Sequence, residues 1–139
     1  MASNFNTDPE NMSIEISDMV RQYTENVSTD VTKEIDDTAN KMLDEIKSTA
    51  PYDPKGNGEY RKGFKIKKSS KSGRTTRIIY NKNCPGLVHL LEFGHVIRNG
   101  TGRYFGETDP RPHMRPAYDK YVPQMEKNID DIIKNGGRK

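Results

Sequence analysis

This sequence lacks tryptophan and long apolar runs, and it has almost no cysteine. Of its 139 residues only Cys84 is a cysteine. A single cysteine excludes an internal disulfide and zinc sites built from several cysteines, and it is typical of proteins from a reducing cytoplasm. No run of about 18 apolar residues is present, so we expect no membrane-spanning helix. The N-terminus also lacks the apolar centre of a signal peptide.

Apolar side chains are scarce as well, at 31% of the residues. This share permits one modest core and favours a subunit that its neighbours help to stabilise. Charge is plentiful but unevenly distributed around a net value of +3. Residues 1–50 hold 11 acidic and 4 basic side chains, whereas residues 51–90 hold 2 acidic and 10 basic ones. Such asymmetry is typical of proteins that dock electrostatically.

A long helix is predicted from Ser13, a candidate N-cap, to the residue before Pro51. Apolar residues recur there at steps of three and four, which places them on one helix face. At about 1.5 Å per residue the helix would be roughly 50 Å long, more than a small core can cover, so part of its apolar face is expected to pack on another subunit. The acidic residues on its polar face form either a solvated surface or a surface for a basic partner: Glu25, Asp30, Glu34, Asp36, Asp37, Asp44 and Glu45.

A basic β-hairpin is predicted over residues 59–81. Tyr60, Phe64 and Ile66 share one side of the first strand, residues 69–73 form the turn, and residues 77–80 lie in the return strand. The hairpin is either a surface that contacts a partner or DNA, or a solvated edge whose lysines prevent aggregation. Its candidate contact residues are Arg61, Lys62, Lys65, Lys67, Lys68, Lys71, Arg74 and Arg77.

A short leucine-rich helix is predicted from Pro85 to a stop at Gly94. Its spacing directs Leu87, Leu90 and Leu91 to the core, with His89 and Glu92 pointing outward as a pair. After it we expect a strand at residues 95–98 and then a long loop. A last helix is predicted over residues 116–135, with either a kink at Pro123 or a true start nearer residue 122. The residues on its apolar face are Tyr118, Tyr121, Val122, Met125, Ile129, Ile132 and Ile133.

The stretch HLLEFGH, with His113 further on, suggests a metal or acid–base site. A zinc protease needs H-E-x-x-H, whereas the order here separates His89 and His95 by about 120° on a helix, so a metal site is not favoured. Catalysis by histidines together with Arg98, Arg103 or Arg111, as in a small ribonuclease, has suitable residue types but no motif. The glycines after residue 99 do not match a phosphate-binding loop. Cys84 would start a helix, although a buried or spectator thiol is the simpler interpretation.

Three separated segments resemble one family. They are STAPYDPKGNGEYRKGFKIK, LVHLLEFGH with its Glu-Phe-Gly end, and DPRPHMRPAYDKY with its Arg-Pro-x-x-Arg-Pro-Ala sequence. In this combination, across residues 40–135, the chain is similar to siphophage head–tail joining proteins, the tail-completion or minor capsid proteins of the HK-type coliphage gene-10 class. The residues that carry the resemblance are Pro51, Leu87, Leu90, Leu91, Glu92, Phe93, Gly94, Arg111, Pro112, Arg115, Pro116 and Ala117.

The resemblance implies an α+β subunit in which a long N-terminal helix and a C-terminal helix pack on a small antiparallel sheet. It implies a ring, with a hexamer as the expected order, in the virion neck between the head connector or stopper and the tail tube. DNA would pass through the lumen without sequence-specific contact. No catalysis, cofactor or membrane is implied, and assembly would take place in the host cytoplasm. The turn after Pro51 departs from the family pattern, because it reads Pro51-Tyr52-Asp53-Pro54 and reaches Gly58 only after extra residues.

Two functions therefore compete: a ring in the virion neck, and a basic domain that binds or cleaves nucleic acid. In either case we expect a single domain over residues 13–135, with flexible ends at residues 1–12 and 136–139.

Overall fold

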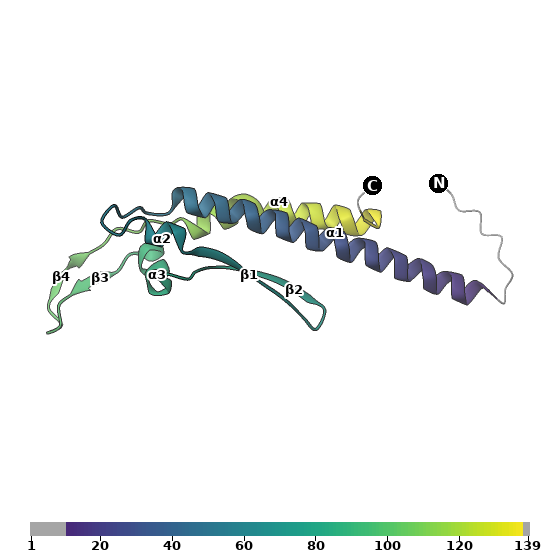
Figure 1. The fold of residues 1–139 in the computed structure, drawn as a ribbon, viewed down its shortest axis with the longest axis horizontal. Helices are drawn as coiled ribbons and strands as arrows, with labels where there is room; N and C mark the ends of the chain where they lie inside the picture. Colours follow the sequence, from purple (N-terminus) through teal and green to yellow (C-terminus); the bar gives the residue numbers. More distant parts are fainter. Residues whose placement is uncertain (1–10, 138–139) are drawn as a thin grey trace.

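The computed structural model describes residues 11–137, and it confirms the α+β class. Two long helices lie side by side. One hairpin and two short helices lie along one flank of this pair, and a second, separate hairpin extends beyond its end (Figure 1). Within the described residues, no helix is long and apolar enough to cross a membrane. The elements in chain order are α1 (Met12–Thr49), α2 (Glu59–Lys62), β1 (Phe64–Lys71), β2 (Arg74–Asn81), α3 (Pro85–Phe93), β3 (Val96–Arg98), β4 (Tyr104–Glu107) and α4 (Met114–Asn135).

Helix α1 follows the prediction except at its first residue. The N-cap is Asn11, which makes no capping hydrogen bond through its side chain, so Ser13 lies inside the first turn and is not the cap. At the other end Ala50 has ψ of 145°, the extended backbone that a following proline imposes. The predicted flexible N-terminus lies outside the described residues, apart from the start of α1.

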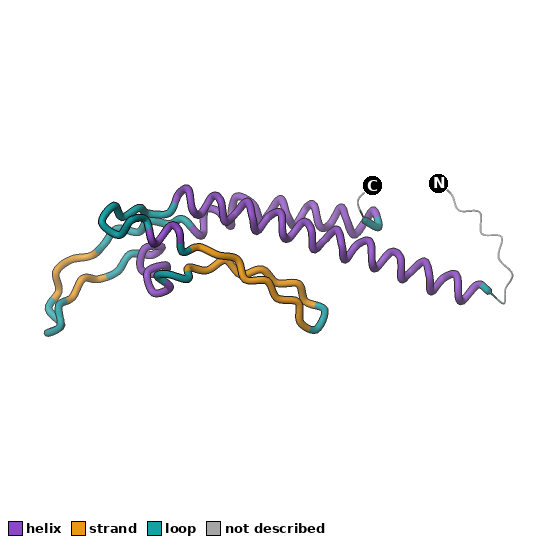
Figure 2. Tube along the Cα trace, viewed as in Figure 1, coloured by secondary structure: helices purple, strands orange, loops and turns teal. Residues whose placement is uncertain are grey.

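Helices α1 and α4 form the main layer of the fold (Figure 2). Tyr23 donates a hydrogen bond of 2.7 Å to the carbonyl of Ile133, which places the end of α4 level with the end of the first third of α1. Beyond that point α1 continues without a partner from α4 (Figure 1). Helix α4 starts at Met114 and runs unbroken through Pro123, so a start near residue 122 is wrong. It ends at Gly136, which has φ of 68°, as the sequence predicts.

Strands β1 and β2 form the predicted hairpin, with small differences at both ends. Phe64 pairs with Asn81 and Lys71 with Arg74, so the turn is only Ser72 and Gly73. Both turn residues have positive φ, as a two-residue turn between strongly twisted strands requires. The turn predicted over residues 69–73 was therefore too long. Tyr60 was also misplaced, because it lies in α2 and not in the strand.

A second hairpin, β3–β4, occupies the region that was predicted to be mostly loop. β3 agrees with the predicted strand, but β4 was missed. The hairpin extends from the end of the molecule opposite to the start of α1 (Figure 1). Four of its apolar side chains are 41–59% exposed, namely Val96, Ile97, Tyr104 and Phe105. Nothing in the local pattern identifies β4, since three glycines interrupt this region.

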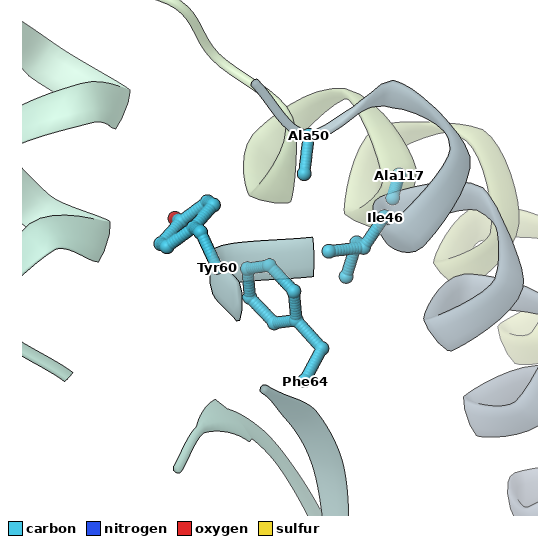
Figure 3. Close-up of a cluster of buried hydrophobic side chains, with 5 residues drawn as sticks. All are labelled: Ile46, Ala50, Tyr60, Phe64 and Ala117. Carbon is cyan, nitrogen blue, oxygen red and sulfur yellow. The ribbon is translucent and has the colours of Figure 1, made fainter. Parts of the chain in front are cut away.

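The core is small and lies where the C-terminal end of α1 meets α2, β1 and the start of α4. Figure 3 shows its five buried side chains, which are Ile46, Ala50, Tyr60, Phe64 and Ala117. The rings of Tyr60 and Phe64 meet edge to face, with centroids 5.1 Å apart. A core of this size is consistent with the low apolar share of the sequence.

Candidate functional site

Glu92 is the centre of a buried polar cluster that joins α3 to the start of α4. Its carboxylate accepts hydrogen bonds from the backbone N–H groups of His113, Met114 and Arg115, at 2.9, 3.1 and 2.8 Å. These amides have no partner inside their own helix, and a negative charge at a helix N-terminus is stabilising. Glu92 therefore caps α4 from another element. The prediction that Glu92 points outward and pairs with His89 was wrong.

The protonation of Glu92 reflects this environment. Burial disfavours the carboxylate, but the three backbone hydrogen bonds, with a smaller contribution from the nearby His113, outweigh it and leave the pKa of Glu92 lowered. The group therefore stays charged inside the fold, where it holds the start of α4.

His113 is 1% exposed and both of its ring nitrogens have partners. Nδ1 lies 2.8 Å from the carbonyl oxygen of Arg111, which can only accept, so Nδ1 carries the proton. In the neutral ring, Nε2 then accepts the hydrogen bond from the Tyr60 hydroxyl at 2.7 Å. Burial, followed by the charge of Glu92, raises the pKa of Tyr60 to about 12. All three side chains are thus used to connect α2, α3 and α4.

The three histidines do not come together. His113 is buried in this cluster, His89 lies on the exposed side of α3 against the ring of Phe93, and Nδ1 of His95 contacts the Thr108 hydroxyl at 3.0 Å. No group of three or more potential metal ligands occurs among residues 11–137. The structure provides no geometry in which these histidines could act on one substrate.

The leucine-rich helix α3 is where the sequence predicted, but its buried face is rotated. Leu91 and Val88 pack against the core, whereas Leu87 is 43% exposed and Phe93 is 67% exposed. The prediction that Leu87 faces the core was wrong. The face turned because Glu92 has to reach the amides of α4. Leu90 is half-buried.

Gly94 does turn the chain, as the sequence predicts. Its φ is +73°, and a Cβ there would lie 2.4 Å from the carbonyl oxygen of Thr108. Only glycine fits this combination of backbone and space. Pro51 likewise ends α1 as predicted.

The Arg-Pro-x-x-Arg-Pro-Ala segment separates into buried and exposed parts. The N–H of Arg111 donates to the carbonyl of Leu91 at 2.7 Å, and Ala117 is fully buried against α1. Pro112, Arg115 and Pro116 are exposed; Arg115 pairs with Asp119 at 3.0 Å. This segment therefore serves mainly to place the start of α4 on the cluster.

The candidate contact residues of the basic hairpin also separate into two groups, those with contacts inside the chain and those that stay exposed. Arg77 forms a 2.5 Å ion pair with Asp36 of α1, and Lys68 lies 3.4 Å from the same carboxylate. The hydrogen bond from Arg77 lowers the pKa of Asp36. Arg61 donates to the carbonyl of Ala50 and lies over the ring of Tyr52. The candidate contact residues that remain exposed and have no such role are Lys62, Lys65, Lys67, Lys71 and Arg74.

The acidic face of α1 is likewise used in part within the chain. Glu34 is buried and accepts a hydrogen bond from Asn128, while Glu45 lies 3.2 Å from Lys120. At Glu45 and Asp36 the basic partner is the chain itself, whereas Glu34 accepts its hydrogen bond from the neutral amide of Asn128. Asp37 is exposed.

An open groove of about 910 Å³ lies between α1, α4, β2 and α3. Its lining is mostly apolar and includes Met42, Met114 and Met125, whose flexible side chains adapt to irregular partners. Ile78, Phe93 and Tyr118 contribute half-exposed or more exposed apolar side chains. The sequence alone did not reveal this groove, because its walls come from four separate elements.

Comparison with known proteins gives one match. Residues 14–94, more than half of the chain, match a family described as "Bacteriophage HK97-gp10, putative tail-component". A search of curated proteins and of solved structures found no match. The matched region spans α1, the basic hairpin and α3 up to Gly94, so it includes Glu92. This chain belongs to the HK97 gp10-like family of bacteriophage tail components.

Proposed function

We propose that the chain is a structural virion protein that forms a ring, a hexamer, in the neck of a siphophage. There it completes or terminates the tail and joins it to the head connector. The observation that carries this proposal is the family match over residues 14–94. The Arg-Pro-x-x-Arg-Pro-Ala segment beyond residue 94 supports it, since it positions α4 on Glu92 of the matched region.

The shape of the subunit supports assembly. Apolar side chains are exposed at both ends: at the start of α1, where Ile16 is 52% exposed, and on the β3–β4 hairpin, where Tyr104 is 59% exposed. Contacts between unlike surfaces close into rings when the rotation between subunits allows it. We also propose that residues 13–135 act as one domain, because α1 contacts α2, both strands of the basic hairpin and α4.

The basic hairpin would contact neighbouring subunits or connector proteins, with DNA as a secondary partner. No acidic residue occurs between Glu59 and Glu92, so the exposed lysines form a surface of one sign. A lumen through which DNA slides should attract phosphates only weakly, which favours protein partners for most of these lysines. The chain would have no catalytic role, because its histidines are separated and one is fully enclosed.

Mass measurement combined with negative-stain imaging tests the ring, and gold labelling of phage particles tests its position. We expect a closed oligomer with a central hole, and label at the junction of head and tail. A chain that stays monomeric alone and on purified connectors and tails would refute the ring. Cleavage of RNA or DNA that is lost on His95→Ala would instead favour the nucleic-acid alternative.

A further inference from the structure

The first turns of α1 form an apolar surface that no other element covers among residues 11–137. We call residues 12–22 the projecting segment, since they lie beyond the level at which α4 ends (Figure 1). Met12, Ile16, Met19 and Val20 lie along one stripe of this segment and are 48–59% exposed. A helix of this length is marginal in water without packing, so the stripe favours a covering partner.

The groove between α1, α4, β2 and α3 is mostly apolar, like the stripe of the projecting segment. It is long enough to be lined by α1 from Ile35 to Ile46, and its rim exposes Ile78, Phe93 and Tyr118. An amphipathic helix that lays an apolar stripe into such a groove is a recurrent mode of recognition.

The projecting segment cannot enter the groove of its own chain. Helix α1 is continuous from Met12 to Thr49, and the groove lies along its C-terminal half. Because the projecting segment and this wall of the groove belong to one continuous helix, the segment stays more than a turn away from the groove. A second copy of the chain can supply it.

Charge selects this segment over the β3–β4 hairpin as the occupant. The charged lining of the groove is itself balanced, with Arg77 and Arg115 against Glu92 and Glu126. The groove borders the basic hairpin, however, which already binds an acidic stretch of α1 through the contact of Asp36 with Arg77. The projecting segment has two acidic residues and one basic residue, whereas the β3–β4 hairpin has Arg98 and Arg103 against a single Glu107. Opposite charge favours the helix at this position, and like charge disfavours the β3–β4 hairpin.

We propose that the projecting segment of one copy packs into the groove of the next copy, with Ile16 and Val20 against Phe93 and Tyr118. The contact is head to tail, because donor and acceptor are different surfaces. This inference rests on the proposed ring and names the surfaces that build it.

Two double variants of the full chain test the contact. The donor variant is Ile16→Glu with Val20→Glu, and the acceptor variant is Phe93→Glu with Tyr118→Glu. All four side chains are at least 49% exposed in the single chain, so folding should be retained, which circular dichroism checks. A matched control is Ile14→Glu with Ser17→Glu, which adds the same charge to the projecting segment but away from its stripe.

We expect each double variant to be monomeric at concentrations where the wild type and the control are assembled. An equal mixture of the two variants should give a dimer of twice 15.9 kDa and nothing larger, since each mixed pair has one intact contact. Monomers in the mixture would overturn the proposal, and assembly by the acceptor variant alone would overturn it in favour of a symmetric contact between two projecting segments. Wild-type assembly by the donor variant would overturn it but leave the proposed ring intact, whereas a monomeric wild type would count against both.

Discussion

Replacement of Glu92 by glutamine is the sharpest test of how this fold is held together. The substitution keeps the shape of the side chain but removes its charge and turns one acceptor oxygen into a donor. Three backbone N–H groups converge on the two oxygens of Glu92, so at least one of them faces an NH₂ group in the variant.

The expected cost follows from two contributions. One buried donor without a partner costs about 1–3 kcal/mol. Loss of a negative charge at the start of α4 costs up to about 2 kcal/mol more when the site is partly buried. We therefore expect Glu92→Gln to lower the free energy of unfolding by about 2–4 kcal/mol, a large part of the roughly 5–15 kcal/mol typical of a domain.

The effect should depend on pH in a defined direction. The pKa of Glu92 is lower in the folded chain than in the unfolded one. Its charge therefore contributes its full stabilisation at a pH above the pKa of Glu92 in the unfolded chain. That stabilisation is lost as the pH falls through the pKa of Glu92 in the folded chain. The difference between wild type and Glu92→Gln should therefore be largest at neutral pH and shrink in acid.

Urea denaturation at neutral and acidic pH measures this difference. The control is Glu126→Gln, which removes a charge from an exposed position on α4. Equal stability of Glu92→Gln and the control at neutral pH would refute the capping role of Glu92. A difference that grows in acid would refute the assigned direction of its pKa.

Three further substitutions test the other contacts. Gly94→Ala should destabilise the fold by at least about 1–3 kcal/mol in urea, because φ is +73° and a Cβ would lie 2.4 Å from a backbone oxygen, whereas Gly86→Ala, in open space, should not. Asp36→Asn should lower the free energy of unfolding by about 1 kcal/mol at neutral pH and by less in acid, because the lowered pKa of Asp36 adds stability only above its pKa in the unfolded chain. The control Asp37→Asn, at an exposed position, should cost nothing measurable. Tyr60→Phe should leave its buried partner unsatisfied at a cost of about 1–3 kcal/mol. It should also remove the loss of stability that the wild type shows between pH 10 and about 12, which thermal melts at alkaline pH would detect.

The sequence by itself determined the elements whose ends depend on local chemistry. Pro51 fixes the end of α1, Gly136 ends α4, and Pro85 and Gly94 bound α3, because proline and glycine restrict or permit backbone angles whatever surrounds them. Alternation of apolar residues likewise indicated the basic hairpin, and three motifs indicated the family. The α+β class was what the resemblance to the family implied, and the helices and hairpins of the structure confirm it.

Only the tertiary structure decided which faces turn inward. Periodicity grouped Leu87 with Leu90 and Leu91, but Glu92 turned inward because the amides at the start of α4, far away in sequence, need an acceptor. The pairing of Arg77 with Asp36 has the same origin, since it joins residues 41 positions apart. The groove exists only because four elements meet around it. Such features depend on long-range contacts, which the spacing of residues along the chain does not encode.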